Sequence, residues 1–156
     1  MSTDRKGGWA AQRHQARALA MQMLFEADFV DNPAHEILIR RLSEDRVPEE
    51  VAAYARELFR GTWQRRLELD DIIARTAPSW PLDQMARVDR NILRLALYEM
   101  LESSEVPLRA VINEAVELAK EYGSDASSRF VNGVLGTVAA GGMDPPEAPA
   151  VAPSEQ

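Results

Sequence analysis

The sequence predicts an all-α protein, and three observations lead to that class. Apolar residues recur at three- and four-residue spacing along most of the chain, which is the period of a helix with one buried face. Proline, glycine and short polar runs separate these segments, and such residues begin or end helices. No stretch keeps the strict alternation of a half-buried strand. We therefore expect about seven helices and no sheet.

The strongest helical pattern lies in the second half of the chain, at Arg87–Met100. Its apolar residues form one wide surface, made by Val88, Ile92, Leu95, Leu97 and Met100. A helix with so much apolar surface needs other helices around it. We expect this segment, continued to about Glu102, to organise the fold.

The first helix is expected at Ala10–Val30, after a short polar tail at residues 1–9 that should be disordered. Its core-facing stripe consists of Ala16, Leu19, Ala20, Met23, Ala27 and Val30. A second stripe beside it holds His14, Arg17, Met21 and Phe25. This second stripe either widens the buried face or offers a basic and aromatic surface to a partner.

Two further helices are predicted in the first half. Asn32 and Pro33 form a helix start, and the helix continues to about Leu42. Pro48 opens a long helix to about Thr76, with a bend near Gly61. The sequence Ala-Pro-Ser-Trp-Pro at 77–81 must interrupt the helix, so it marks a boundary between two lobes.

The second half adds three helices after a single turn at Leu82–Met85. They are expected at Arg87 to about Glu102, at Pro107 to about Glu121, and at Ala126–Ala139. Gly133 lies inside the last of these, and close approach of another helix would compensate for the helix propensity it lacks.

One helical domain at 10–140 follows from these elements, with lobes at about 10–77 and 81–140. The Pro/Ala-rich tail at 141–156 should be disordered.

The composition predicts a cytoplasmic protein. The 156 residues include no cysteine, which fits a reducing compartment. No apolar run approaches the roughly 20 residues that span a membrane, and the polar N-terminus does not resemble a secretory signal.

The charge is unevenly distributed. A net charge of −7 argues against nonspecific binding to nucleic acid. Residues 1–25, however, hold Arg5, Lys6, Arg13 and Arg17 against Asp4 alone, a local charge of +3 (four cations minus one anion). The N-terminal end is therefore the candidate for phosphate contact.

No pattern indicates catalysis. The chain lacks a thiol, a glycine-rich phosphate loop, and the nucleophile or zinc signatures of hydrolases. With only two histidines, a metal centre is not expected, nor is a cofactor. We expect a binding protein and not an enzyme.

Several segments together resemble the NusB family of transcription antitermination factors. They are R-H-Q-A-R and A-M-Q-M-L-F-E-A-D near the N-terminus, then V-D-R-N-I-L-R-L-A-L-Y-E-M, V-I-N-E-A-V-E-L-A-K-E-Y-G and F-V-N-G-V-L-G. Each alone is weak, but their order and spacing are specific. The resemblance covers about residues 12–139.

This resemblance implies two helical bundles packed against each other and an RNA-binding function. Members bind boxA-type RNA in rRNA leader transcripts together with a small-subunit ribosomal protein, NusE, in an antitermination complex on RNA polymerase. The family's arginine-rich RNA-binding segment falls here on Arg13, His14, Gln15 and Arg17. Members often have a denser arginine run, and His14 and Gln15 occupy two of those positions. Phosphate affinity should therefore be lower, or more dependent on pH, than in arginine-rich members. Phe25 and His14 are candidates for stacking on bases.

The resemblance also places the ribosomal-protein contact on the second lobe. By position it falls on Asp89, Arg94, Arg129 and Phe130. The alternative function is a homodimeric all-helical interaction protein without direct RNA readout, which would associate through the second stripe of the first helix.

Overall fold

The prediction of an all-α protein is confirmed. The computed structural model describes residues 2–29, 33–44, 46–103 and 105–141, with side chains from residue 8 onward. Over these residues the chain forms seven α-helices, one 3₁₀ turn and no strand. The elements are α1 (Ser2–Phe29), α2 (Ala34–Glu44), α3 (Glu49–Gln64), α4 (Arg66–Thr76), η1 (Leu82–Gln84), α5 (Arg87–Glu102), α6 (Leu108–Tyr122) and α7 (Ser127–Gly141).

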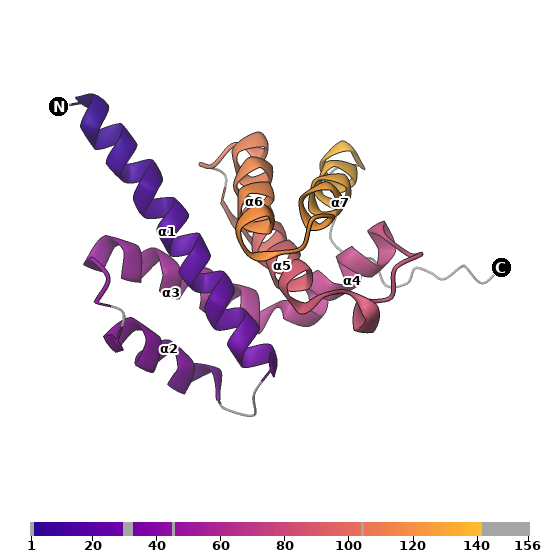
Figure 1. Ribbon diagram of the computed structural model, residues 1–156, viewed down its shortest axis with the longest axis horizontal. Helices are drawn as coiled ribbons and strands as arrows, with labels where there is room; N and C mark the ends of the chain where they lie inside the picture. The colour runs from indigo at the N-terminus through magenta and orange to yellow at the C-terminus, as the bar shows by residue number, and fades with distance from the viewer. Residues whose placement is uncertain (1, 30–32, 45, 104, 142–156) are drawn as a thin grey trace.

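Helix α5 lies at the centre of the molecule, as its apolar surface predicts (Figure 1). Helices α1, α2 and α3 pack on one another, and α5, α6 and α7 form a second group. Helix α5 joins the two groups because it also contacts α1, α3 and α4, and α4 reaches α7. No described helix has the length and apolar character that crossing a lipid bilayer requires.

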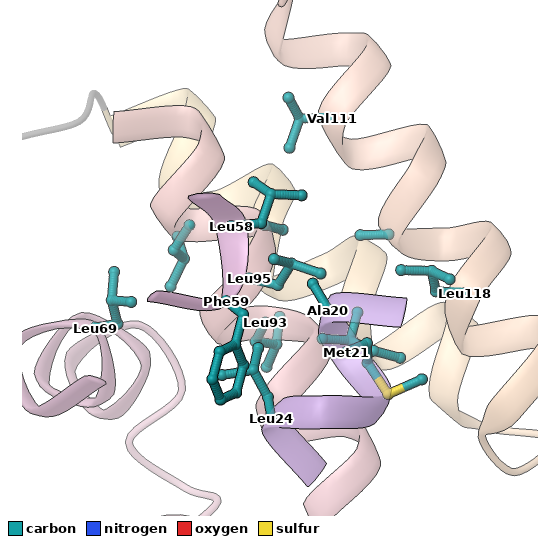
Figure 2. Packing of buried hydrophobic residues seen from close by; sticks show 14 of the residues in the cluster. Ala20, Met21, Leu24, Leu58, Phe59, Leu69, Leu93, Leu95, Val111 and Leu118 are labelled. Atoms are coloured by element: carbon teal, nitrogen blue, oxygen red, sulfur yellow. The ribbon is translucent and has the colours of Figure 1, made fainter. Parts of the chain in front are cut away.

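The buried apolar side chains form one continuous cluster (Figure 2). It includes Met21 and Leu24 of α1, Phe59 of α3 and Leu93 of α5, and all four are at most 2% exposed. The predicted stripe of α1 is buried from Ala16 to Ala27. Its last member, Val30, lies outside the described residues, as does the predicted cap Asn32.

Helix α1 begins earlier than the sequence suggested. It starts at Ser2, so residues 2–9, expected to be disordered, are helical. Two glycines at positions 7 and 8 led to the expectation of a break. Each costs about 1 kcal/mol relative to alanine, but extending an existing helix avoids the cost of nucleation. At the other end α7 includes Gly141, and the tail predicted beyond it lies outside the described residues.

The long helix predicted from Pro48 to Thr76 is two helices, and its bend is not at Gly61. The break lies at Arg65, whose φ of −103° and ψ of 15° leave the helical region. Gly61 stays inside α3, where the ring of Tyr98 from α5 occupies the side-chain position. A Cβ atom at Gly61 would lie 2.1 Å from Tyr98 Cζ. This glycine therefore permits close packing of α3 against α5.

Gly133 in α7 has no such role, which corrects the expectation of a close helix approach. A Cβ atom there would meet nothing within 4 Å. Gly133→Ala should therefore raise the free energy of unfolding by about 0.5–1 kcal/mol, because alanine is the better helix former. Urea unfolding measures the gain. Gly61→Ala is the comparison and should gain less or lose stability, since the Tyr98 ring must move. Equal gains at the two positions would contradict this account.

Candidate nucleic-acid interface

Arg13 of α1 is held between two aromatic rings. Its Cζ atom lies 4.4 Å from the ring centroid of Trp9, one turn earlier, and 3.8 Å from the ring centroid of Tyr54 on α3. Such cation–π contacts contribute roughly 0.5–2 kcal/mol each. They orient the guanidinium without neutralising it, and the side chain remains partly exposed. Neither ring was predicted to take part. The contact of Trp9 with Arg13 could have been found from the sequence, because residues four positions apart lie on the same face of a helix. No sequence pattern near Arg13 indicates the contact with Tyr54.

Arg17, predicted to contact RNA, is instead buried. It is 6% exposed, and its Nε and Nη2 atoms donate to Glu99 of α5 at 2.9 and 2.6 Å. The hydroxyl of Tyr54 donates to the same carboxylate. Burial, and then this hydrogen bond, raise the pKa of Tyr54, so the hydroxyl stays protonated. The Arg17–Glu99 ion pair links α1 to α5, and the Arg17 guanidinium is not accessible to a ligand.

His14 is also paired within the chain. Its Nδ1 lies 2.8 Å from Glu114 Oε1 and its Nε2 lies 3.1 Å from Glu121 Oε2, both on α6. The hydrogen bond with Glu114 is the main reason that the pKa of His14 is raised above its usual value, although partial burial opposes this. The imidazolium donates to both carboxylates, which offset its charge. Gln15, the neighbouring predicted residue, is exposed.

Arg13 thus differs from the other cations of α1. Among those with described side chains, only Arg13 has no carboxylate within ion-pair distance. Of the residues predicted to bind RNA between positions 13 and 17, Arg13 is therefore the cation that can still contact a phosphate.

Phe25 lies far from Arg13 on the same helix. Twelve residues separate them, which is about 18 Å along the axis at about 1.5 Å per residue. The Phe25 ring is partly buried and stacks on Phe29, with 5.8 Å between ring centroids. It lines a shallow groove of about 340 Å³ that also touches Met21 and Tyr122. The structure therefore does not bring Phe25 together with the basic segment.

The second stripe of α1 is largely covered by the chain itself. Met21 is 2% exposed, Arg17 is bound to α5, and His14 is bound to α6. The homodimer alternative needs this stripe as a free surface. Within the described residues the stripe instead widens the buried face of α1.

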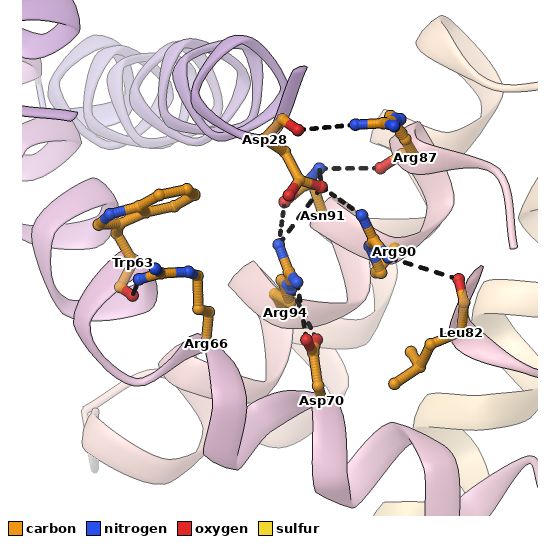
Figure 3. A network of polar contacts seen from close by, with 9 residues as sticks. All are labelled: Asp28, Trp63, Arg66, Asp70, Leu82, Arg87, Arg90, Asn91 and Arg94. Carbon is orange, nitrogen blue, oxygen red and sulfur yellow. Dashed lines mark hydrogen bonds and ion pairs between the residues drawn. The ribbon is translucent and has the colours of Figure 1, made fainter. Parts of the chain in front are cut away.

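Arg94, predicted to contact a protein partner, lies in the interior (Figure 3). It is 4% exposed, and its Nε and Nη2 atoms donate to the two carboxylate oxygens of Asp70 on α4, each at 2.7 Å. Its Nη1 donates to Asn91 at 3.1 Å and lies 3.5 Å from Asp28 of α1. The role of Arg94 in partner binding stays a prediction, but its guanidinium is enclosed by acids on α1 and α4, which periodicity cannot show.

Asp28 completes this network with two other arginines of α5. It accepts a hydrogen bond from Arg90 at 2.6 Å, and its backbone carbonyl accepts one from Arg87 (Figure 3). Burial opposes ionisation of Asp28, but the hydrogen bond from Arg90 and the charge of Arg94 outweigh it and lower the pKa of the carboxyl. The network links α1, α4 and α5.

The remaining predicted partner residues lie in different environments. Asp89, in the first turn of α5, is 8% exposed, and its Oδ1 has no hydrogen-bond partner among the described residues. Arg129 is exposed, and Phe130 is partly exposed with its ring centroid 5.5 Å from that of Trp80. Trp80 is 51% exposed. An accessible aromatic and basic surface thus exists at the start of α7, formed by Trp80, Arg129 and Phe130.

A metal centre is not indicated within the described part of the chain. No group of three histidine, cysteine, aspartate or glutamate side chains is placed to hold an ion there. The arrangement of Arg13 suits binding of an anion or a stacked ring.

Comparison with known proteins identifies the family. Residues 14–140 match the NusB family. The chain belongs to the NusB family. Transcription antitermination protein NusB of Roseiflexus castenholzii is 54% identical over 131 residues, which cover 83% of this chain and 92% of that protein. The NusB protein of Herpetosiphon aurantiacus is 49% identical over 135 residues, covering 81% and 88% of the two chains.

Solved NusB structures share the fold. NusB of T. maritima has a TM-score of 0.74 and 36% identity, over 80% of this chain and 87% of that one. A chain from the crystal structure of antitermination factors NusB and NusE in complex with dsRNA has a TM-score of 0.72 and 29% identity, over 81% and 94%. The resemblance to the NusB family is confirmed. The curated relatives are transcription antitermination proteins, in agreement with the prediction that the chain is not an enzyme.

Proposed function

We propose that this NusB-family chain binds boxA-type single-stranded RNA in rRNA leader transcripts together with the ribosomal protein NusE, within an antitermination complex on RNA polymerase. The observation that carries the proposal is Arg13, a cation of α1 that is oriented by Trp9 and Tyr54 and has no carboxylate within ion-pair distance among the described residues. The names of the curated relatives and the solved complex of NusB and NusE with dsRNA support it.

A partner is needed because this chain offers RNA little positive charge. The net charge is −7, and Arg17 and His14 are paired with carboxylates of the chain itself. Each neutralised phosphate adds one counterion-release contribution, so the few cations at the N-terminal end of α1 give weak and only slightly salt-dependent binding. A basic ribosomal protein beside α1 would extend the cationic surface. We propose the surface formed by Trp80, Arg129 and Phe130 as part of its docking site.

Arg13→Glu tests this function. We expect RNA affinity of the protein with NusE to fall at least about tenfold, because a charge attracting phosphate becomes one that repels it. The slope of log affinity against log salt should flatten by about 0.7, because Arg13 no longer neutralises a phosphate of the single strand. Fluorescence anisotropy with labelled boxA RNA measures both quantities, and binding of NusE alone should be unchanged.

Arg75→Glu is the matched control, since it makes the same charge change at the end of α4, far from the N-terminal part of α1 (Figure 1). Its effect on RNA affinity should be small. The proposal fails if Arg13→Glu leaves RNA affinity unchanged, if wild-type protein binds no RNA with NusE present, or if NusE binding disappears with the arginine.

A further inference from the structure

A cleft of about 350 Å³ lies beside Arg13, between α1 and α3. This volume falls within the range of about 300–1,000 Å³ that is common for small-molecule sites. The side chains that matter for its chemistry are Trp9, Gln12, Arg13, Glu50, Tyr54 and Glu57.

The aromatic wall of the cleft is available to a planar ligand. Trp9 is 55% exposed although its ring already contacts the Arg13 guanidinium. Trp9, Arg13 and Tyr54 therefore form a stack whose outermost ring is open to solvent. Aromatic rings in such positions bind unpaired bases by stacking, largely without regard to base identity.

The polar wall selects what kind of planar ligand fits. Glu50 and Glu57 are exposed, and ionised carboxylates only accept hydrogen bonds. They would repel a phosphate group placed inside the cleft, so a phosphate bound by Arg13 would lie outside it. A second cation is disfavoured as well, because Arg13 already holds the position between the two rings. A neutral ring with amino donors satisfies both walls.

We propose that this cleft binds one unpaired nucleobase that carries an exocyclic amino group, namely adenine, cytosine or guanine. The base stacks on Trp9, and its amino group donates to Glu50 or Glu57, as carboxylates accept from cytosine N4 in other nucleic-acid complexes. Gln12 offers an amide that can pair with a neighbouring edge of the base. The inference rests on the proposed function in that the base belongs to the bound RNA. It adds base selection at one nucleotide to the phosphate contact of Arg13.

Free nucleosides test the cleft without any phosphate. The indole N–H signals of Trp9, Trp63 and Trp80 are followed by NMR in the full-length protein, with Trp9→Phe assigning the first. Adenosine and cytidine should shift the Trp9 signal in a saturable way, and uridine should bind at least about fivefold more weakly because it lacks the amino donor. Trp63 is an internal control whose signal should not shift, because the Cζ atom of Arg66 lies 3.9 Å from its ring centroid and covers the ring. Glu50→Gln with Glu57→Gln should remove most of the preference over uridine.

Three results would overturn the inference. The first is an unshifted Trp9 signal, and the second is equal affinities for the three nucleosides. The third is a Trp9 signal that shifts with methylguanidinium and not with nucleosides, because the cleft would then be a site for a partner's cationic side chain.

A second measurement places the cleft in the RNA complex. Trp9→Ala should weaken boxA RNA binding by the protein with NusE about tenfold. The salt slope should stay unchanged, because Trp9 neutralises no phosphate. This pattern separates loss of stacking from loss of the Arg13 charge. Phe29→Ala is the matched control, since Phe29 is another exposed ring of α1 beneath an arginine, with Arg87 Cζ 5.0 Å from its centroid.

The two proposals can fail separately. If Trp9→Ala matches wild type in RNA affinity, or if Phe29→Ala weakens RNA binding equally, the cleft does not bind a base. If Arg13→Glu is without effect on RNA affinity, the proposed function fails, and the nucleoside titration still decides the cleft.

Discussion

Replacing Glu99 with glutamine should lower the free energy of unfolding by about 3–5 kcal/mol, the usual cost of removing one member of a buried ion pair. Glu99 is 2% exposed and accepts hydrogen bonds from Arg17 and Tyr54. Without its charge the Arg17 guanidinium would stay buried, and the acid left near it among the described residues is Glu114, whose Oε1 lies 3.6 Å from Nη1. Urea unfolding followed by circular dichroism measures the loss.

A double variant distinguishes the ion pair from simple packing. Arg17→Met removes the uncompensated charge, so Arg17→Met with Glu99→Gln should be less destabilised than the sum of the two single changes. Additive losses would show that the two side chains stabilise the protein independently. A loss below about 1 kcal/mol for Glu99→Gln, the level of an exposed pair, would show that water reaches this site.

Arg94→Met should have an effect of similar size, about 3–5 kcal/mol, for a different reason. Arg94 is the cation shared by Asp70 and Asp28, which are themselves mostly buried. Its removal takes away the cation that Asp70 pairs with, while Asp28 keeps Arg90, and it loosens α4 from α5. Thermal and urea unfolding report the change.

Arg75→Met is the surface control for Arg94→Met. The Arg75–Asp71 pair is an exposed i,i+4 pair with 3.1 Å between Nε and Oδ2. Exposed pairs contribute roughly 0–1 kcal/mol. Equal losses from Arg75→Met and Arg94→Met would contradict the interior role of the Arg94 network.

Most of the fold was predictable because helical periodicity and proline positions are local signals. The predicted helix from Arg87 to Glu102 has the same bounds as α5, and the expected stripe of α1 is buried. The break at Arg65 was not predictable, because no glycine or proline marks it. Gly61 suggested a bend, but its role depends on Tyr98, which is 37 positions away.

The candidate site was less predictable because local patterns place charged residues on the surface. Arg17 and Arg94 are arginines on helices, and only the tertiary arrangement shows that Glu99 and Asp70 enclose them. The same limit applies to Asp89. Arg13 could be predicted as a cation of α1. The position of Tyr54, and the lack of an acidic partner for Arg13 in the part of the chain that the structure describes, follow from how α1 lies on α3.

The Arg17–Glu99 pair has a consequence for the order in which the protein is made. The two residues are 82 positions apart, so the ribosome completes α1, α2 and α3 well before the carboxylate that neutralises Arg17 exists. Until then, the Arg17 guanidinium lacks the carboxylate that holds it in the folded protein. Tyr54, which faces Arg13, also lacks its Glu99 acceptor in that nascent chain. The surface around Arg13 therefore reaches its final arrangement only after α5 emerges. A fragment ending at Gln64 would lack the Glu99 contacts that hold Arg17 and Tyr54 in place.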